Sequence, residues 1–237
     1  METLVGEYCG FVDAGYLVAA GARALSLRTN QVRPNAAAVV DWLAGLGPPA
    51  RADGDALLRT YWYDGAYDST HSRHASQKRF HDAIALTSGI QVRLGHLAER
   101  RSPRMRTPIR AALRNTAVDL GIEPDELVST FETHWEWRPE HSQKGVDTLL
   151  TLDLVRLGQS GASETAVLVT GGRDLAEAVR TVQDLGRRVV IASPRRSPVA
   201  QELHQLADVV VTIGPDWLGA MLTTRAGQHV TSSHRAA

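Results

Sequence analysis

The chain has 237 residues, and its 26 Lys and Arg residues balance its 26 Asp and Glu residues to a formal net charge of zero. This balance argues against a uniformly basic, histone-like nucleic-acid binder, and a hydrophobic content of 43% excludes a wholly disordered chain. The single cysteine, Cys9, excludes an internal disulfide and a cysteine-built zinc site. The sequence shows neither a signal-peptide pattern nor an apolar run long enough to span a membrane, so we expect a cytoplasmic protein.

Short apolar runs alternate with helical patterns along the chain. Strands are predicted at residues 8–12, 57–63, 90–94, 166–169, 188–192 and 209–213. Helices are predicted at residues 34–46, 75–87, 109–120, 146–157, 175–185, 198–206 and 215–224. Several of the strands are apolar at consecutive positions, which is typical of strands buried on both faces. The alternation predicts an α/β protein with a mostly parallel central sheet and helices on both of its faces.

Residues 98–143 interrupt this alternation, because they contain no strand-like run. We interpret them as an arginine-rich helical insertion in a single domain of residues 1–225, which a disordered tail at 226–237 follows. Seven arginines and one acidic residue, Glu99, lie between Arg93 and Arg114, so we expect phosphate contacts there. Trp135 and Trp137 either stack on unpaired bases or, as we prefer, form a small core of the insertion. The alternative for the arginines is docking on acidic faces of their own domain. The basic residues predicted to bind nucleic acid are Lys144, Arg100, Arg101, Arg104, Arg106 and Arg110.

Aspartates follow or open several of the predicted elements. Asp13 directly follows strand 8–12, Asp174 follows strand 166–169 through a Gly-Gly-Arg turn, and Asp147 opens helix 146–157. Because the carboxyl ends of parallel strands share one edge of a sheet, we expect these three side chains to lie together. Converging carboxylates repel one another unless a cation neutralises them, and oxygen ligands favour Mg²⁺ or Mn²⁺. The sequence therefore predicts a metal site that activates water and holds a phosphate.

These aspartates also have structural interpretations. Asp147 and Asp174 are equally well explained as helix caps or as partners of the helix dipole. Asp13 is harder to explain in this way, because burying a carboxylate without a partner is costly. Asp153 lies six residues after Asp147, about 240° away around a helix, so we expect its side chain to point away from that of Asp147. We therefore interpret Asp153 as a residue that either positions the metal-site residues without binding the ion or stabilises the fold. Asp64 follows strand 57–63; we interpret it chiefly as a turn residue, with a supporting role at the site as the alternative.

Four segments of the chain share a recognisable order. They are residues 11–17 (FVDAGYL), 61–65 (YWYDG), 143–147 (QKGVD) and 167–175 (VLVTGGRDL). Together they resemble the NYN domain, in the LabA-like branch of the PIN-like nuclease superfamily, over about residues 8–214 without the insertion. The resemblance implies a PIN-like three-layer α/β/α sandwich that cleaves RNA with a metal. It places Asp13, Asp147 and Asp174 at the metal site and Asp153 at a recurrent family position.

The chain departs from the family pattern at two positions. Gly172 stands where family members usually have an acidic residue two positions before the last aspartate. Tyr16 stands where an asparagine is frequent in the first motif. Losing one carboxylate lowers the charge that holds metal, so one ion is better supported than two. The departure therefore bears on activity more than on the fold.

We predict from the sequence a Mg²⁺- or Mn²⁺-dependent endoribonuclease, a hydrolase that acts on single-stranded RNA. Asp13, Asp147 and Asp174 would be both metal ligands and catalytic residues, and arginines of the insertion would hold the strand. Two alternatives stay open: a catalytically impaired NYN-type RNA- or nucleotide-binding module, and a regulatory protein-interaction subunit. Pairing into a homodimer is left open by analogy with PIN-like domains. The use of only two lysines, with abundant Ala, Gly and Val, indicates a bacterial source.

Overall fold

The computed structural model of the chain describes residues 6–52, 54–100, 107–134 and 140–224. The chain divides into two compact units, one of Met1–His96 with Gln143–Ala237 and the other of Leu97–Ser142. Within the described ranges, no helix combines the length and the apolar character that crossing a membrane requires. The predicted tail at 226–237, together with Trp135 and Trp137, lies outside these ranges.

A seven-stranded sheet forms the centre of the first unit, in the order β5-β4-β3-β1-β6-β7-β8. Its strands are β1 (Glu7–Asp13), β3 (Ala56–Ala66), β4 (Ile90–Arg100), β5 (Glu140–Lys144), β6 (Thr165–Val169), β7 (Arg188–Pro194) and β8 (Val209–Ile213). The neighbouring strands from β4 to β8 all pair in parallel. A separate antiparallel pair joins β2 (Val32–Pro34) to β9 (Leu222–Thr224).

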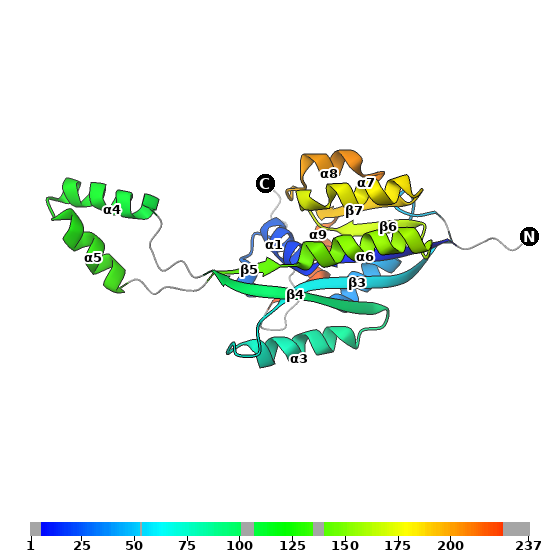
Figure 1. Ribbon diagram of the computed structural model, residues 1–237, viewed down its shortest axis with the longest axis horizontal. Coiled ribbons are helices and arrows are strands. Elements are labelled where there is room, and N and C mark those ends of the chain that lie inside the picture. Colours follow the sequence, from blue (N-terminus) through cyan, green and yellow to red (C-terminus); the bar gives the residue numbers. More distant parts are fainter. Residues whose placement is uncertain (1–5, 53, 101–106, 135–139, 225–237) are drawn as a thin grey trace, which may run out of the picture. The chain divides into compact units, whose positions relative to one another are not determined.

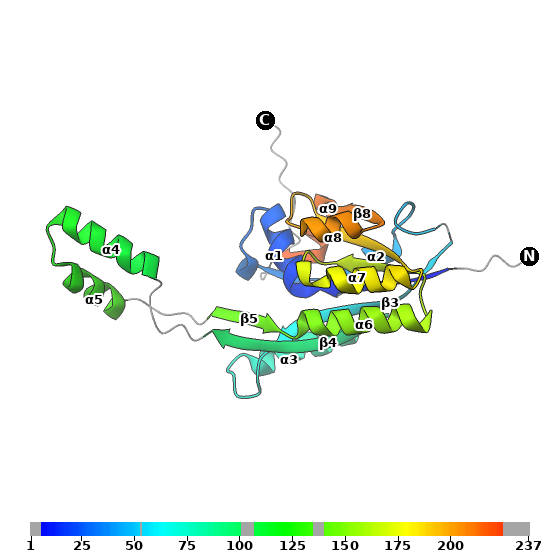
Figure 2. The ribbon, with the colours of Figure 1, turned by 45° about the horizontal axis from the view of Figure 1, so that its top comes forward.

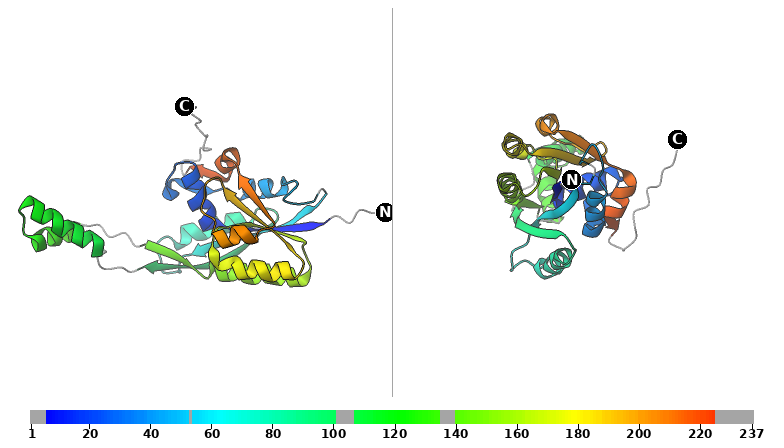
Figure 3. Two further views of the ribbon diagram at one scale, coloured as in Figure 1. Left: turned by 90° about the horizontal axis from the view of Figure 1, so that it is seen from above. Right: turned by 90° about the vertical axis from the view of Figure 1, so that its right-hand side faces the viewer.

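Helices cover both faces of the sheet (Figures 1 and 2). One face carries α1 (Ala14–Ala24), α2 (Ala36–Ala44), α3 (His74–Ala85) and α9 (Pro215–Met221). The other carries α6 (Val146–Ser160), α7 (Ala176–Asp184) and α8 (Gln201–Leu206). In the left view of Figure 3, α6 and α7 lie on one side of the strands and α1 and α9 on the other. The expected α/β architecture, a PIN-like three-layer sandwich, is confirmed.

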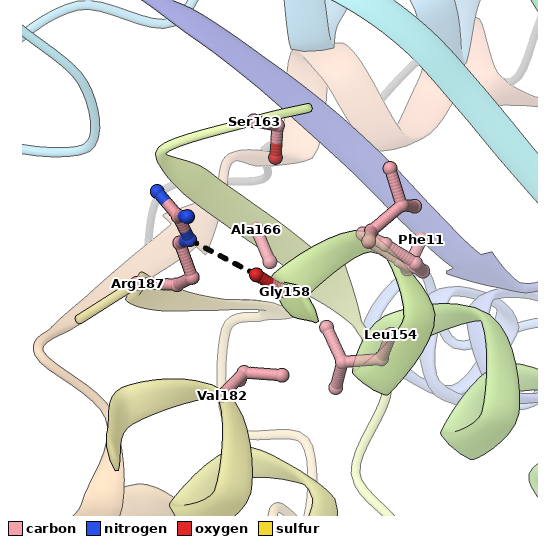
Figure 4. A pocket seen from close by; sticks show the side chains of 8 residues that line it. Phe11, Leu154, Gly158, Ser163, Ala166, Val182 and Arg187 are labelled. Atoms are coloured by element: carbon pink, nitrogen blue, oxygen red, sulfur yellow. Dashed lines mark hydrogen bonds between the residues drawn. The ribbon is translucent and has the colours of Figure 1, made fainter. Parts of the chain in front are cut away.

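The two cores follow from the alternation of side chains along the strands. Val12 of β1 and Trp62 of β3 belong to the core under α1 and α2, whereas Phe11 and Tyr63 belong to the core under α6 and α7. Phe11 stacks on Tyr63 with ring centroids 6.5 Å apart. Figure 4 shows a small pocket in the second core, next to the hydrogen bond from Arg187 Nε to the Gly158 carbonyl. The hydrogen bond is 3.2 Å long, and the pocket has a volume of about 10 Å³, enough for about one water.

The described residues of the second unit include two helices, α4 (Thr107–Leu120) and α5 (Pro124–His134). The turn between them uses Gly121 in a left-handed conformation, with φ of 68°. Ala117 and Val128 are buried within this unit. Arg110 pairs with Glu132, its Nε donating at 2.9 Å, and Arg114 pairs with Asp125 at 2.6 Å. Helix 109–120 is confirmed as predicted, and α5 was not predicted.

Strands β4 and β5 and helix α1 differ from the elements that were predicted from the sequence. Residues 98–143 contain strand residues, since β4 continues to Arg100 and β5 begins at Glu140, so the expectation of no strand there is wrong. The β5 sequence (EHSQK) is polar because an edge strand needs no apolar side chains, and an apolar pattern therefore cannot reveal it. Helix α1 was also not predicted, because its glycines lower its helix propensity.

Candidate active site

The carboxyl ends of the parallel strands bring separate segments to one edge of the sheet. Asp13 ends β1 and pairs in register with Tyr63 of β3, which places Asp64 one residue further along. On the other side of β1, Val12 pairs with Val169, the last residue of β6. The turn that leads to Asp174 therefore starts beside Asp13. The register of three strands, rather than any local motif, makes these residues neighbours.

Asp13 is the half-buried centre of this edge. It is the N-cap of α1, where its Oδ1 accepts a hydrogen bond from the Tyr16 N–H at 3.0 Å. Its pKa is raised to about 6, first because the carboxyl is buried. The backbone N–H groups of Tyr16 and Gly15 oppose this rise, while the negative charges of Asp147 and Asp64 add to it. Asp13 is thus close enough to both acidic neighbours to be repelled by them.

Asp147 and Asp174 act on the same edge of the sheet, and we call the four residues Asp13, Asp64, Asp147 and Asp174 the acidic edge. Asp147 is the second residue of α6, and Asp174 lies in the short 3-10 helix η2 (Arg173–Leu175). Both residues are exposed, yet partial burial of the Asp147 carboxyl raises its pKa, and the charge of Asp174 raises it further. Neither helix has a side-chain cap at its start. Neither residue therefore caps its helix, although both lie in a first turn, where an acid interacts favourably with the helix dipole. The aspartate that does cap a helix is Asp13.

Asp64 was interpreted chiefly as a turn residue, but its carboxylate is fixed by several contacts. It lies inside β3, which continues to Ala66. Its Oδ1 accepts hydrogen bonds from the Gly65 N–H at 2.8 Å and from Gln143 Nε2 at 3.0 Å, and its Oδ2 lies 3.0 Å from Nε2 of the buried His81. These three contacts fix the carboxylate in one orientation beside Asp13.

Gln143 and His81 are site residues that were not predicted from the sequence. A Cβ added to Gly15 would lie 2.6 Å from Gln143 Oε1, so Gln143 packs against the first turn of α1 while it binds Asp64. It thereby ties the acidic residue of β3 to the helix that Asp13 caps. The available signal was its place at the start of the segment QKGVD. His81 had no signal, because only the packing of α3 on β3 brings it to Asp64.

Asp153 points away from this edge, as its helical spacing predicted. It is 8% exposed, and its Oδ2 accepts hydrogen bonds from the Tyr63 hydroxyl at 3.1 Å and from Arg93 Nε at 2.9 Å. The Arg93 guanidinium also lies over the Tyr61 ring, 5.8 Å from its centroid. These contacts connect α6 to β3 and β4, so they stabilise the packing of the helix on the sheet.

The basic residues that were predicted to bind nucleic acid lie in different parts of the structure, and not all of them are described. Lys144 is exposed at the end of β5, three residues before Asp147, and Gly145 separates it from α6. Arg110 belongs to the second unit and is paired with Glu132. Arg100 ends β4, and its side chain is not described; Arg101, Arg104 and Arg106 lie outside the described residues. Their phosphate contacts stay a prediction.

The acidic edge offers carboxylate oxygens as ligands for a divalent ion. Among the described residues, no three His, Cys, Asp or Glu side chains are close enough to enclose a metal directly. Direct ligation of one ion by Asp13, Asp147 and Asp174 together therefore stays a prediction. Mg²⁺ usually keeps several waters and is held by one or two carboxylates. The acidic edge, whose carboxylates repel one another, offers ligands for an ion that is bound in this way. In the described parts of the chain, none of these three aspartates forms an ion pair with a basic side chain, so a bound cation would relieve their repulsion.

Gly95 of β4 allows the start of α6 to approach the sheet. A Cβ added there would lie 2.6 Å from the Lys144 carbonyl oxygen and 3.0 Å from the Val146 nitrogen. We expect Gly95→Ala to lower the free energy of unfolding by about 1–3 kcal/mol, because backbone must move. Urea denaturation would measure this loss. Gly172→Ala is the matched control, since its added Cβ would meet nothing within 4 Å, and equal stability of the two variants would contradict the prediction.

The fold and the acidic edge together define the class of this protein, which is a three-layer α/β/α protein with the nuclease-like, PIN-like sandwich. The sequence profile of the NYN domain matches residues 11–214, and the chain belongs to this family. Its assignment to the LabA-like branch stays a prediction. A solved structure of a protein of unknown function from Vibrio parahaemolyticus has a similar fold, with a TM-score of 0.51 and 15% identity, covering 90% of this chain and 96% of that one. No curated protein matches the sequence.

Proposed function

We propose that this NYN-domain protein is a metal-dependent ribonuclease that hydrolyses phosphodiester bonds of single-stranded RNA at the acidic edge. The observation that carries the proposal is the position of Asp13. Its carboxyl is half-buried at the end of β1, its pKa is raised to about 6, and the charges of Asp147 and Asp64 repel it. A stable fold tolerates such a cluster where function requires it.

The residues of the edge have separate roles in this proposal. Asp13 and Asp147 would hold Mg²⁺ or Mn²⁺ with help from Asp174, directly or through water. The ion, when bound, supplies charge neutralisation at the phosphate and activation of water. The Tyr16 N–H holds the Asp13 carboxylate at 3.0 Å, and Gln143 holds the Asp64 carboxylate at 3.0 Å, so the two acids keep their spacing. Lys144, exposed at the end of β5, would bind a phosphate oxygen of the strand.

Cleavage assays of the full-length chain test this function. A labelled single-stranded RNA should be cut in the presence of Mn²⁺ or Mg²⁺, and chelator should stop the reaction. Single-stranded DNA and double-stranded RNA of the same sequence serve as comparison substrates. RNA binding with a steep salt dependence but no cleavage would instead select the catalytically impaired module. Absence of RNA affinity, together with a stable protein partner, would select the interaction subunit.

Restoring the acidic residue at position 172 is expected to strengthen metal binding. A side chain there would meet nothing within 4 Å, and Gly172 has φ of −74° and ψ of 129°, which any residue adopts. We expect Gly172→Asp to bind Mn²⁺ about tenfold more tightly, because a further carboxylate raises the charge that attracts the ion. Calorimetric titration would measure the change, and Gly172→Asn is the neutral control. Equal affinities of the two variants would show that position 172 does not face the ion.

A further inference from the structure

A groove of about 470 Å³ lies on the face of the sheet that α1 and α3 cover, and Tyr67, which directly follows β3, is part of its lining. Its lining comes from α1, from η1 (Thr29–Gln31) with β2, and from the first half of α3 with the segment before it. The residues that line it include Val18, Val32, Arg33, Tyr67, Arg73 and Phe80. All of them belong to the first unit.

The wall of the groove and the acidic edge are joined by hydrogen bonds. Gln77, which lines the groove, donates from Nε2 to the Gly65 carbonyl at 2.8 Å and accepts at Oε1 from the Tyr67 N–H at 2.8 Å. Gly65 is the neighbour of Asp64 in β3, and Asp64 is the acid whose charge acts on Asp13. A ligand in the groove would therefore lie next to the proposed site of cleavage.

Aromatic and apolar side chains give the groove a surface on which a base can stack. The Tyr67 ring stacks on the His71 ring with centroids 4.0 Å apart and planes within 5° of each other. This contact covers one face of the tyrosine ring and fixes the orientation of the ring in the lining. Phe80 is half-buried in the same lining, and Val18 and Val32 complete its apolar part. Bases of single-stranded RNA are bound by such rings, whatever their sequence.

Two arginines supply positive charge at the groove. Arg33 and Arg73 are exposed, and no described carboxylate pairs with either of them. No Asp or Glu occurs among the described residues of the lining. In the groove near α8, by contrast, Glu202 already pairs with Arg173 and Arg180. The groove beside α3 thus combines free guanidinium groups with an aromatic surface, the two elements that recognise a nucleotide.

We propose that this groove holds one nucleotide of the RNA strand next to the phosphate that is cleaved, with its base on Tyr67 and Phe80 and its phosphate between Arg33 and Arg73. The inference rests on the proposed function, because it names where the substrate strand is held. If a base stacks in this groove, the groove also determines whether the protein prefers single-stranded or double-stranded RNA. A base paired within a duplex presents no free face to a tyrosine ring, so single-stranded RNA is favoured.

Binding in the presence of chelator tests the groove separately from cleavage. A short fluorescein-labelled oligoribonucleotide is titrated with the full chain, and fluorescence anisotropy is read at several salt concentrations. For the double variant Arg33→Gln with Arg73→Gln, we expect at least about tenfold weaker binding and a salt slope smaller by about 0.7, because the two arginines hold one phosphate. Arg79→Gln, exposed on the same α3 but outside the lining, should bind within about twofold of wild type.

Changes at Tyr67 test the stacking part of the proposal. Tyr67→Ala should weaken binding about fivefold or more, whereas Tyr67→Phe should retain wild-type affinity because it keeps the ring. In the wild-type protein, 4-thiouridine in the oligoribonucleotide should cross-link to the segment around Tyr67 and Arg73. A mononucleotide should compete weakly, since it offers no neighbouring phosphates to the protein.

The outcomes separate this inference from the proposed function. If the double variant binds RNA as wild type does, or if cross-links fall only outside the groove, the inference is overturned even when Mn²⁺-dependent cleavage is found. If the groove variants lose affinity but no cleavage occurs with any metal, the groove is supported and the ribonuclease proposal fails. A mononucleotide that binds as tightly as the oligoribonucleotide would overturn the assignment of the groove to a strand.

Discussion

Asp13→Asn is expected to lower the cleavage rate at saturating RNA by at least about 100-fold, which corresponds to about 2.7 kcal/mol of activation free energy. The charges of Asp147 and Asp64 both raise the pKa of Asp13, so Asp13 is in electrostatic contact with two other acids of the acidic edge. Asparagine has nearly the same shape and no charge, and it is as good an N-cap as aspartate. The variant should therefore keep α1 and the Tyr16 hydrogen bond, and the lost rate would report the missing charge.

The same substitution is expected to stabilise the metal-free protein at neutral pH. The pKa of Asp13 is about 6, against an ordinary value of 3.8. Because this pKa is higher in the folded than in the unfolded chain, the folded chain binds the proton more tightly. The resulting stability is full below about pH 4 and is lost as the pH rises through about 6. Above that pH the ionised carboxylate costs the native state about 3 kcal/mol, which Asp13→Asn avoids.

Urea denaturation in chelator, at about pH 4 and about pH 7.5, measures this effect. The gain of Asp13→Asn over wild type should be present at the higher pH and small at the lower one. Mn²⁺ should then stabilise wild type and leave the variant unchanged, because the ion binds only the charged site. Asp41→Asn, at an exposed position of α2, is the matched control and should show neither effect. A variant that cleaves RNA at the wild-type rate would remove Asp13 from the site.

Asp153→Ala is expected to lower the free energy of unfolding by about 3 kcal/mol. The substitution removes the acceptor of both the Tyr63 hydroxyl and Arg93 Nε. Tyr63 is fully buried and Arg93 is partly buried, so neither group gains full access to water in compensation. Tyr63→Phe should cost only about 1 kcal/mol, because it removes one neutral donor and leaves the ion pair.

Denaturant titration gives these free energies, with Asp184→Ala at the exposed end of α7 as the control. That control should change stability by less than about 0.5 kcal/mol. The cleavage rate per folded molecule of Asp153→Ala should stay near that of wild type, since Asp153 points to β3 and β4 rather than to the acidic edge. A loss no larger than that of the control would show that the Tyr63–Asp153–Arg93 contacts contribute little.

The main elements of the fold follow from local patterns in the sequence. Strands such as β1 and β6 are apolar at consecutive positions because both of their faces are buried, and this makes them visible without a structure. Helix α7 ends just before Gly186, which adopts a left-handed conformation with φ of 76°. Helix α1 escaped prediction because its glycines serve packing: a Cβ at Gly21 would lie 2.5 Å from Leu222 Cδ1. Such a contact joins residues far apart in the chain.

The sequence by itself determined the fold class, the family resemblance and the aspartates that follow the strands, because each depends on short-range patterns. Only the tertiary structure decided which acids act on one another. The register of β1 against β3 puts Asp64 beside Asp13, and the packing of β5 and α3 brings Gln143 and His81 to Asp64. These contacts span up to 79 positions of the chain, as for Gln143 and Asp64, so no local pattern encodes them. The same packing forms the groove beside α3, which no segment of the sequence shows alone.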